Sequence, residues 1–276
     1  MRLVKAEFRK LLTTNTWWLF ALGAVVTWAA TFALNALFAH FTLTQAPPTD
    51  MSPEDAANLA AVSDQVYQAA NLYTSGQFCG LLFVVVLGIL MVTNEFHHQT
   101  ATATFLATPH RTSVISAKLG VASIIGVLFW LITTALDIPA TMIFFQTENM
   151  SSHLGDSSVQ RAILLNGLAY LLWGIFGVGI GVLMRSQIAA TVTAVLAYVL
   201  GTAIVGFLFT LLSQSLDQPW IKDVQYALPS IASGLMVAGT DLPDQPSYWV
   251  GGVILVAWAV VTGAIGTLIT RTRDIS

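Results

Sequence analysis

Long apolar runs dominate this chain, and short polar stretches separate them. A helix needs about 20 apolar residues to cross the hydrocarbon core of a bilayer, because each residue adds about 1.5 Å of length. Six segments approach or exceed that length, namely residues 17–40, 75–93, 116–145, 162–183, 188–212 and 248–270. The pattern predicts an all-α integral membrane protein with six transmembrane helices in a single transmembrane domain, 1–276.

Two of these spans depart from the ideal length. The cleanly apolar part of the second covers only residues 78–92, so we expect residues 72–76 to help it across the bilayer. The third is longer than a bilayer requires, which indicates a tilted helix or a kink at Pro139.

Composition excludes an ordinary soluble domain. Hydrophobic residues make up 55% of the chain and charged residues 9%, and the mean hydropathy is +0.73. The single cysteine, Cys79, allows neither an intrachain disulfide nor a C-x-x-C site. The first apolar run exceeds the roughly 7–15 residues of a secretory signal core, so we expect a retained anchor.

The positions of the basic residues predict the orientation, because cytoplasmic loops close to span ends collect Lys and Arg. With the N-terminus inside, only Arg161 and Lys222 fall outside. The residues that fall inside are Arg2, Lys5, Arg9, Lys10, Arg111, Lys118, Arg185, Arg271 and Arg273. Both termini and the polar stretch 94–118 are therefore expected on the cytoplasmic side.

Two large external segments follow from this orientation, 42–74 and 213–247. In the first, Ser52 and the acids after it predict the start of a helix. In the second, residues 227–239 are apolar but too short to span, which favours a re-entrant or interfacial helix before the last span.

The N-terminal segment 1–14 reads as an amphipathic elbow helix. At helical spacing, one side gathers Val4, Phe8, Leu11 and Leu12, and another gathers Arg2, Lys5 and Arg9. One interpretation is that the basic residues only set the orientation of the chain in the membrane and that the helix has no further role. The other is a helix in the membrane interface that leads into the first span and offers a surface to a cytosolic partner.

The polar stretch 94–118 carries little catalytic material. Its histidines, His97, His98 and His110, lack the spacing of a zinc site, since adjacent histidines point to different sides of a helix. No G-x-x-x-x-G-K-[ST] phosphate-binding motif occurs anywhere in the chain. We therefore expect no metal site and no ATP hydrolysis by this chain alone.

The same stretch has features of a docking element. Glu95 stands at the end of the second span, a moderately amphipathic run TATATFLAT follows, and Pro109 stops it before the third span begins. Its small and apolar residues would fit a groove on a partner protein. A solvated connecting loop is the alternative that these residues leave open.

These residues also resemble those of a known family. The order Glu95, Thr100, Phe105-Leu106, Thr108-Pro109-His110-Arg111 and Lys118 is similar to the loop between the second and third spans in permease subunits of type-2 ABC exporters. The topology, the basic N-terminal helix and the L-P-S-x-A stretch at 228–232 extend the resemblance over nearly the whole chain. The family commonly has Gly where Gln99 stands here.

The resemblance implies a role for each matching position of the loop. Glu95 would cap or pair at the start of a coupling helix, residues 101–106 would form its contact face, and Arg111 would anchor it. The implied docking residues are Glu95, Thr100, Ala101, Thr102, Phe105, Leu106 and Arg111.

It also implies partners and a location. The chain would pair with a second permease copy or a sister permease, and with two ATPase subunits that bind ATP and Mg²⁺, while itself holding no cofactor and being no enzyme. The chain would be a multi-pass protein of a bacterial plasma membrane and would be surrounded by membrane lipids. The resemblance implies no binding of nucleic acid.

Two features inside the spans invite interpretation. Asp137 lies in the third apolar run, where an acid is costly unless it is paired, protonated or facing water. It is either a pathway or gate residue, together with Pro139, or an acid near the outer interface that caps a helix re-forming after the proline. On the fourth span, Gly177 and Gly181 have the G-x-x-x-G spacing of closely packed helices.

Other functions stay open beside the exporter subunit. An ion-coupled secondary transporter would depend on Asp137, although we find neither the internal repeat nor the paired broken helices typical of that class. A non-transporting membrane scaffold or immunity protein would use the same docking loop. The sequence gives no indication of the substrate.

Overall fold

A computed structural model of the chain describes residues 2–14, 16–46, 51–100, 111–184, 186–216, 218, 220–243 and 245–272. Within these ranges the secondary structure is helical and contains no strand. The elements, in chain order, are α1 (Arg2–Leu12), α2 (Thr16–Thr44), α3 (Pro53–Val62), α4 (Gln65–Tyr73), α5 (Gln77–His97), α7 (Arg111–Thr147), α8 (Ser157–Leu183), α9 (Gln187–Leu196), the π-helix η1 (Ala197–Gly201), α10 (Thr202–Leu216), α11 (Trp220–Asp223), the 3₁₀-helix η2 (Val224–Ala227), α12 (Pro229–Val237) and α13 (Tyr248–Thr272).

The six predicted spans are confirmed as six helical segments long and apolar enough to cross a membrane. They correspond to α2, to α4 with α5, to α7, to α8, to α9 through α10, and to α13. The protein therefore has the helices of a multi-pass membrane protein.

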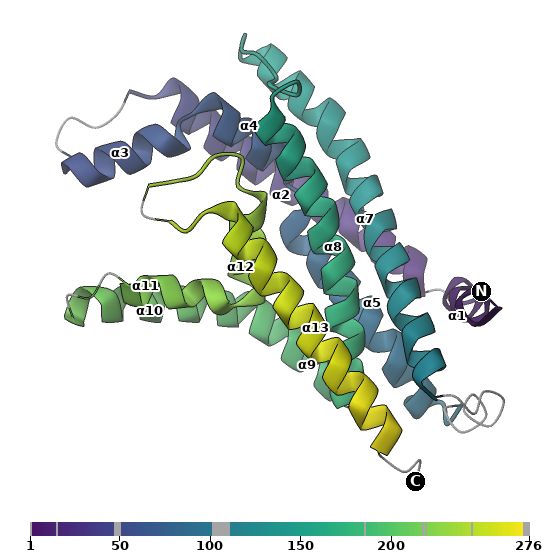
Figure 1. The fold of residues 1–276 in the computed structure, drawn as a ribbon. Helices are drawn as coiled ribbons and strands as arrows, with labels where there is room; N and C mark the ends of the chain where they lie inside the picture. The colour runs from purple at the N-terminus through teal and green to yellow at the C-terminus, as the bar shows by residue number, and fades with distance from the viewer. Residues whose placement is uncertain are drawn as a thin grey trace.

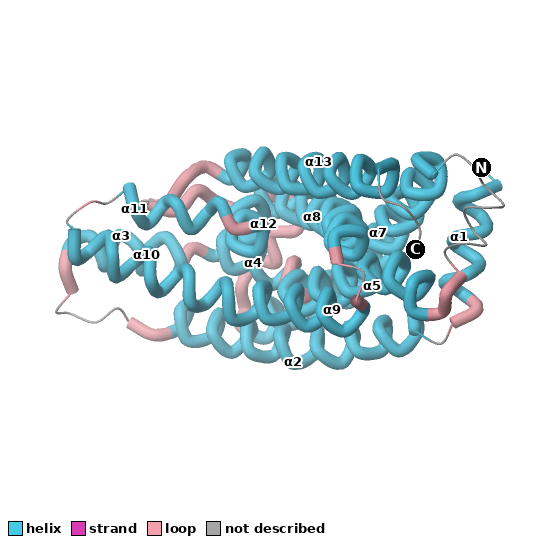
Figure 2. The backbone as a smooth tube through the Cα atoms, turned by 90° about the horizontal axis from the view of Figure 1, so that it is seen from below, coloured by secondary structure: helices cyan, strands magenta, loops and turns pink. Residues whose placement is uncertain are grey.

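Helix α8 lies at the centre of the bundle. It packs against α5, α7 and α13 (Figures 1 and 2), and glycines make these contacts close. A side chain on Gly177 would collide with the backbone of Val85, and one on Gly181 would lie 2.9 Å from the carbonyl oxygen of Ile89. These two glycines thus allow α5 and α8 of the same chain to approach at backbone distance.

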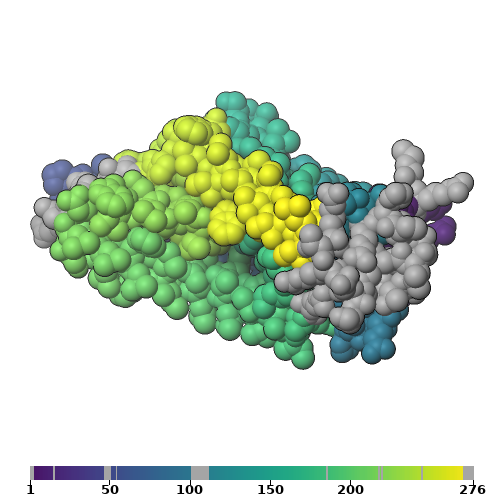
Figure 3. All heavy atoms as spheres, turned by 60° about the horizontal axis from the view of Figure 1, so that its bottom comes forward, coloured from purple at the N-terminus to yellow at the C-terminus, as the bar shows by residue number. Residues whose placement is uncertain are grey.

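The first and fifth spans lie at the margin of the bundle. Exposed apolar side chains cover much of both, for example Leu34 of α2 at 66% and Phe207 of α10 at 65%. Helix α10 has no buried residue among those described, and its side chains form part of one outer face in Figure 3 (green). These faces suit lipid or another apolar surface rather than water.

The segment before the second span contains two helices with a break between them. Ser52 caps α3 as predicted, and its hydroxyl accepts a hydrogen bond from the amide of Asp55 at 3.1 Å. Asp64 then starts a separate helix, α4, by accepting from the amide of Tyr67 at 2.9 Å. Residues 74–76 form a turn, but the segment long and apolar enough to span a membrane runs from Gln65 to His97 and so includes residues 72–76, as expected. Helix α5 itself runs on to His97, four residues beyond the predicted end.

Two further predictions concern α7 and the short apolar segment before the last span. For the over-long third span we predicted a tilted helix or a kink at Pro139, and helix α7 runs unbroken through this proline. The short apolar helix predicted within 227–239 exists as α12, and it lies against α13 and α8. Its buried face, which includes Ala232, Leu235 and Met236, is covered by protein.

The close contact of α5 and α8 predicts that Gly177→Ala destabilises the protein. The new methyl group would meet backbone, which cannot move aside as a side chain can, and overpacking of this kind costs about 1–3 kcal/mol. Unfolding of the purified protein by SDS in mixed micelles, followed by tryptophan fluorescence, measures the loss.

Gly120→Ala is the matched control, because a methyl group on this helical glycine of α7 would meet nothing within 4 Å. It should leave stability unchanged or raise it slightly through better helix propensity. Equal effects of the two substitutions would contradict the packing argument.

Candidate functional site

Four charged side chains from three helices meet at the end of the bundle where α1 lies. Glu7 and Lys10 stand one turn apart on α1, Glu95 lies in the last turn of α5, and Lys118 projects from the third turn of α7. We call these four residues the charge cluster. The cluster joins the two helices that flank residues 98–110 to each other and to the N-terminal helix.

Lys118 is the centre of the cluster. Its ammonium group donates hydrogen bonds to Glu7 Oε2 at 2.6 Å and to the carbonyl oxygen of Met91 at 3.0 Å, and it forms an ion pair with Glu95 Oε1 at 2.9 Å. The ammonium group of Lys118 thus has three partners within the protein, two of them carboxylates.

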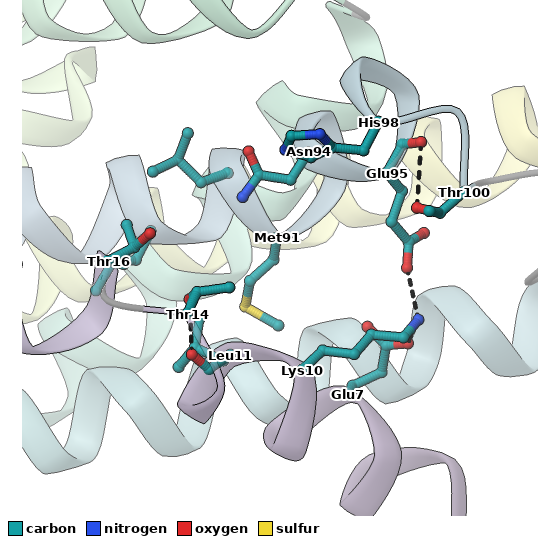
Figure 4. Close-up of a pocket in the computed structure, with 12 residues that line it drawn as sticks. Glu7, Lys10, Leu11, Thr14, Thr16, Met91, Asn94, Glu95, His98 and Thr100 are labelled. Carbon is teal, nitrogen blue, oxygen red and sulfur yellow. Dashed lines mark hydrogen bonds and ion pairs between the residues drawn. The ribbon is translucent and has the colours of Figure 1, made fainter.

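Lys10 closes the cluster from the outer side. Its ammonium group lies 2.8 Å from Glu7 Oε1 and 2.8 Å from Glu95 Oε1 (Figure 4). Since Lys118 also pairs with Glu7 and Glu95, each lysine contacts both acids. Two cations and two anions balance, which leaves the cluster without net charge.

The burial of three of the four side chains determines how strongly the protein's stability depends on these ion pairs. The side chain of Lys118 is 2% exposed, Glu7 7% and Glu95 10%, whereas Lys10 is 49% exposed. A buried charge without its partner is strongly destabilising, while an exposed pair contributes little. The burial of Lys118, Glu7 and Glu95 in their charged forms therefore requires all three side chains, and the half-exposed Lys10 adds a second positive charge beside the two acids.

The electrostatics of α1 follow from this arrangement. Burial raises the pKa of Glu7, but the charge of Lys118 and the hydrogen bonds from Lys10 and Lys118 outweigh it, so the pKa lies below its ordinary 4.5. For Lys10, burial lowers the pKa, but the hydrogen bonds to Glu7 and Glu95 outweigh it and the pKa lies above its ordinary 10.5. Both groups are held in their charged forms.

A hollow of about 290 Å³ adjoins the cluster between α1 and α5 (Figure 4). Polar residues line it beside the cluster, including Asn94, His98 and Thr100, and apolar residues such as Leu11 and Met91 form the remaining wall. Thr100, which lines the hollow, is the last described residue before the docking segment continues at 101. The arrangement can transmit displacement, because a movement at the end of α5 acts through fixed ion pairs on α1 and α7 together.

The structure places part of the predicted docking segment. Glu95 lies in the last turn of α5, and its carbonyl oxygen accepts from the amide of Thr100 at 2.9 Å. Gln99 has a φ of 56°, a left-handed conformation at the position where the resembled family commonly has Gly. Ala101, Thr102, Phe105 and Leu106 lie outside the described residues, as does the side chain of Arg111. Within the described part, Glu95 is paired by Lys10 and Lys118.

The N-terminal segment forms a helix, α1, whose apolar side is covered by the rest of the chain; its role as an elbow helix in the membrane interface stays a prediction. Val4, Phe8 and Leu11 pack against the core of the bundle, and α1 lies mainly against α7. Lys5 and Arg9 are exposed, and the side chain of Arg2 is not described. Leu12, which we expected on the apolar side, is 45% exposed, because the packed stripe ends with Leu11.

Sequence reasoning did not identify the charge cluster. Lys10 entered it only as a charge that indicates orientation, and Lys118 only as such a charge and as the last residue of the family resemblance. One local signal was present, since Glu7 is the single acid in a basic helix and stands three residues before Lys10, a spacing that pairs side chains on a helix. The contacts with Glu95 and Lys118 had no local signal.

Asp137 is fully buried within the bundle. Its exposed fraction is 0%, and its Oδ1 accepts a hydrogen bond of 2.7 Å from Trp28 Nε1 on α2. Because α7 continues unbroken through Pro139, the interpretation of Asp137 as the cap of a re-forming helix is wrong. A role for Asp137 in a pathway or gate stays a prediction.

Among the described residues, no group of three or more His, Cys, Asp or Glu side chains is arranged so that it could hold a metal ion. His97 and His98 contact each other edge to face, with ring centroids 4.9 Å apart.

Neither a protein-family model nor a curated protein matches the chain. The functional argument therefore depends on the geometry of the molecule.

Lys118→Met should destabilise the protein by about 3–5 kcal/mol, because it leaves Glu7 and Glu95 buried beside a single, half-exposed cation. The methionine keeps most of the side-chain volume, so the loss reports on charge. SDS unfolding in mixed micelles measures the difference. Lys5→Met is the control, since Lys5 is exposed on α1 and takes no part in the cluster; equal effects at both positions would refute the dependence.

The stabilisation by Glu7 should also depend on pH with a definite sign. Because the folded pKa is depressed, the contribution of the carboxylate is fully present above the ordinary pKa of 4.5 and is lost as the pH falls through the lower folded value. The stability difference between wild type and Glu7→Gln, measured from about pH 7 to about pH 3, should therefore shrink toward acid. A difference that grows toward acid would contradict the pairing.

Proposed function

We propose that this protein is the transmembrane permease subunit of an ATP-driven exporter, and that segment 94–118 couples it to a separate ATPase. The observation that carries the proposal is the charge cluster. It fixes the end of α5 and the start of α7, the two helices flanking the expected docking segment, to each other and to α1.

The physical argument concerns how force enters the bundle. A loop joined to two independent helices would absorb a push from a partner by bending. Here Lys118 binds the acid at the end of α5, so a displacement of the loop moves α5 and α7 together. Since α5 and α7 both pack against the central α8, the displacement reaches the middle of the bundle.

The same end of the molecule supports a cytoplasmic orientation for the segment. The N-terminus, the last turn of α5, the first turn of α7 and the end of α13 lie toward one end of the bundle (Figures 1 and 2). The exposed basic residues Lys5, Arg9 and Lys10 belong to this end, in agreement with the positive-inside rule. In this proposal ATP and Mg²⁺ bind the partner ATPase, two copies of which act with two permease chains.

The proposal predicts that the chain, purified from its native host in mild detergent, brings with it a protein that carries a phosphate-binding loop. Changing both Phe105 and Leu106 to Asp should abolish that association, because charged side chains cannot occupy an apolar groove without partners. Quantitative mass spectrometry of the eluate and an ATPase assay measure both results.

Trp220→Asp is the matched control, an apolar-to-acid change at a residue of α11 that is 62% exposed and remote from the segment. It should leave the association intact.

A chain that purifies without an ATPase, and that moves a solute in proteoliposomes only when Asp137 is present and a proton gradient is imposed, would replace this proposal with an ion-coupled transporter.

A further inference from the structure

A break in the second apolar stretch lies beside a polar hollow. Residues 65–97 are long and apolar enough to span a membrane as one segment, yet Thr74–Gly76 form a turn between α4 and α5. Gly76 fits there because a side chain would lie 2.8 Å from Thr133 Cβ and 3.0 Å from Trp28 Cδ1. In spanning segments, irregular backbone is tolerated where it is buried in protein or lines a cavity.

The hollow at this break has a volume of about 370 Å³, within the range of small-molecule sites, about 300–1,000 Å³. Its walls come from α2, α4, the first turn of α5, α12 and the segment after α12. It therefore lies where five parts of the chain converge, away from the charge cluster.

Half of the residues that line the hollow have uncharged polar side chains. Its hydrogen-bonding side chains include those of Asn35, Tyr67, Asn71, Ser75, Gln77 and Gln245. No charged residue lines the hollow among the residues described. A charged ligand would lose its hydration there without gaining a counter-charge, which makes a neutral ligand the better fit.

Some of these groups are fixed by the protein. Asn35 donates to Ser75 Oγ at 3.1 Å, Ser75 donates to the carbonyl oxygen of Asn71 at 3.2 Å, and Gln77 donates to the carbonyl oxygen of Ser233 at 3.2 Å. These bonds connect α2, the turn, α5 and α12 around the hollow. The site is thereby pre-organised, which lowers the cost of binding.

Other groups have hydrogen-bonding capacity to spare. The side chains of Tyr67, Asn71 and Gln245 make no hydrogen bond within the described part of the chain. A carboxamide both donates and accepts, and so does a phenol. The complementary ligand is one whose own groups both donate and accept, as hydroxyl groups do.

Apolar residues complete the wall, among them Phe78, Leu235 and Leu242. A ligand that fits must therefore present apolar C–H surface as well as hydroxyl groups. A sugar ring has both, since its hydroxyl groups lie around the edge and its C–H bonds on the faces.

We propose that the hollow between α4, α5 and α12 is a binding site for a neutral sugar. Asn71 and Gln245 hydrogen-bond the ring hydroxyl groups, and Phe78 with Leu242 covers a ring face. That this sugar belongs to the exported cargo rests on the proposed function; the binding itself does not require it.

The test is saturation-transfer NMR on the full chain in lipid nanodiscs, which contain no glycoside detergent. The neutral probes are N-acetylglucosamine and maltose; glucosamine and glucuronate are the charged probes, and N-acetyl-Ala-Ala-amide supplies peptide groups without hydroxyl groups. Neutral sugars should receive magnetisation above the level of empty nanodiscs. Asn71→Leu and Gln245→Leu should each raise the Kd about tenfold, the effect of one lost hydrogen bond.

Gln214→Leu is the matched control, because Gln214 is exposed on α10, outside the hollow. It should leave the Kd unchanged. Gln245 is also exposed, so its replacement leaves the fold intact and separates loss of a contact from unfolding. The proposal is overturned if neutral sugars give no transfer above empty nanodiscs, if either charged sugar or the peptide binds as well as they do, or if neither substitution changes the Kd.

The experiment is independent of the ATPase partner. Sugar binding by a chain that never recruits an ATPase would retain the site and refute the exporter. Recruitment of an ATPase without sugar binding would retain the exporter and refute the site.

Discussion

A lysine buried among apolar helices requires counter-charges, and this requirement organises one end of the molecule. Lys118 is 2% exposed, and an uncompensated ammonium group at such a position costs several kcal/mol. The acids that compensate it come from two other helices, so α1, α5 and α7 can be placed in few ways relative to one another. An apolar contact tolerates sliding, whereas two carboxylates aimed at one ammonium group fix both the depth and the rotation of each helix.

Close backbone packing gives the middle of the bundle its own constraint. Gly177 and Gly181 bring α8 within backbone distance of α5, and α8 also contacts α7 and α13. The charge cluster therefore acts on helices that are held tightly against a common neighbour. The marginal spans, α2 and α9 through α10, have largely exposed apolar faces and stand outside this tightly packed set.

The sequence predicted those features that depend on neighbouring residues. Six apolar runs became six spanning segments because the requirement of a bilayer for apolar length is local, and Ser52 started α3 because a cap needs only the next three residues. The features it missed depend on distant ones. At the turn Thr74–Gly76, Trp28 and Thr133 pack closely against Gly76, and the pairing of Lys118 with Glu7 joins residues 111 positions apart. No periodicity along the chain records such contacts.

The same separation along the chain has a consequence for biosynthesis. Helix α1 is made first, but its ion-pair partners follow 85 residues later, in Glu95, and 111 residues later, in Lys118. Until the ribosome has completed the start of α7, Glu7 has only Lys10 on its own helix as a partner. The docking of the N-terminal helix on α5 and α7 therefore cannot precede the synthesis of both, and it is one of the steps that complete the fold rather than one that begins it.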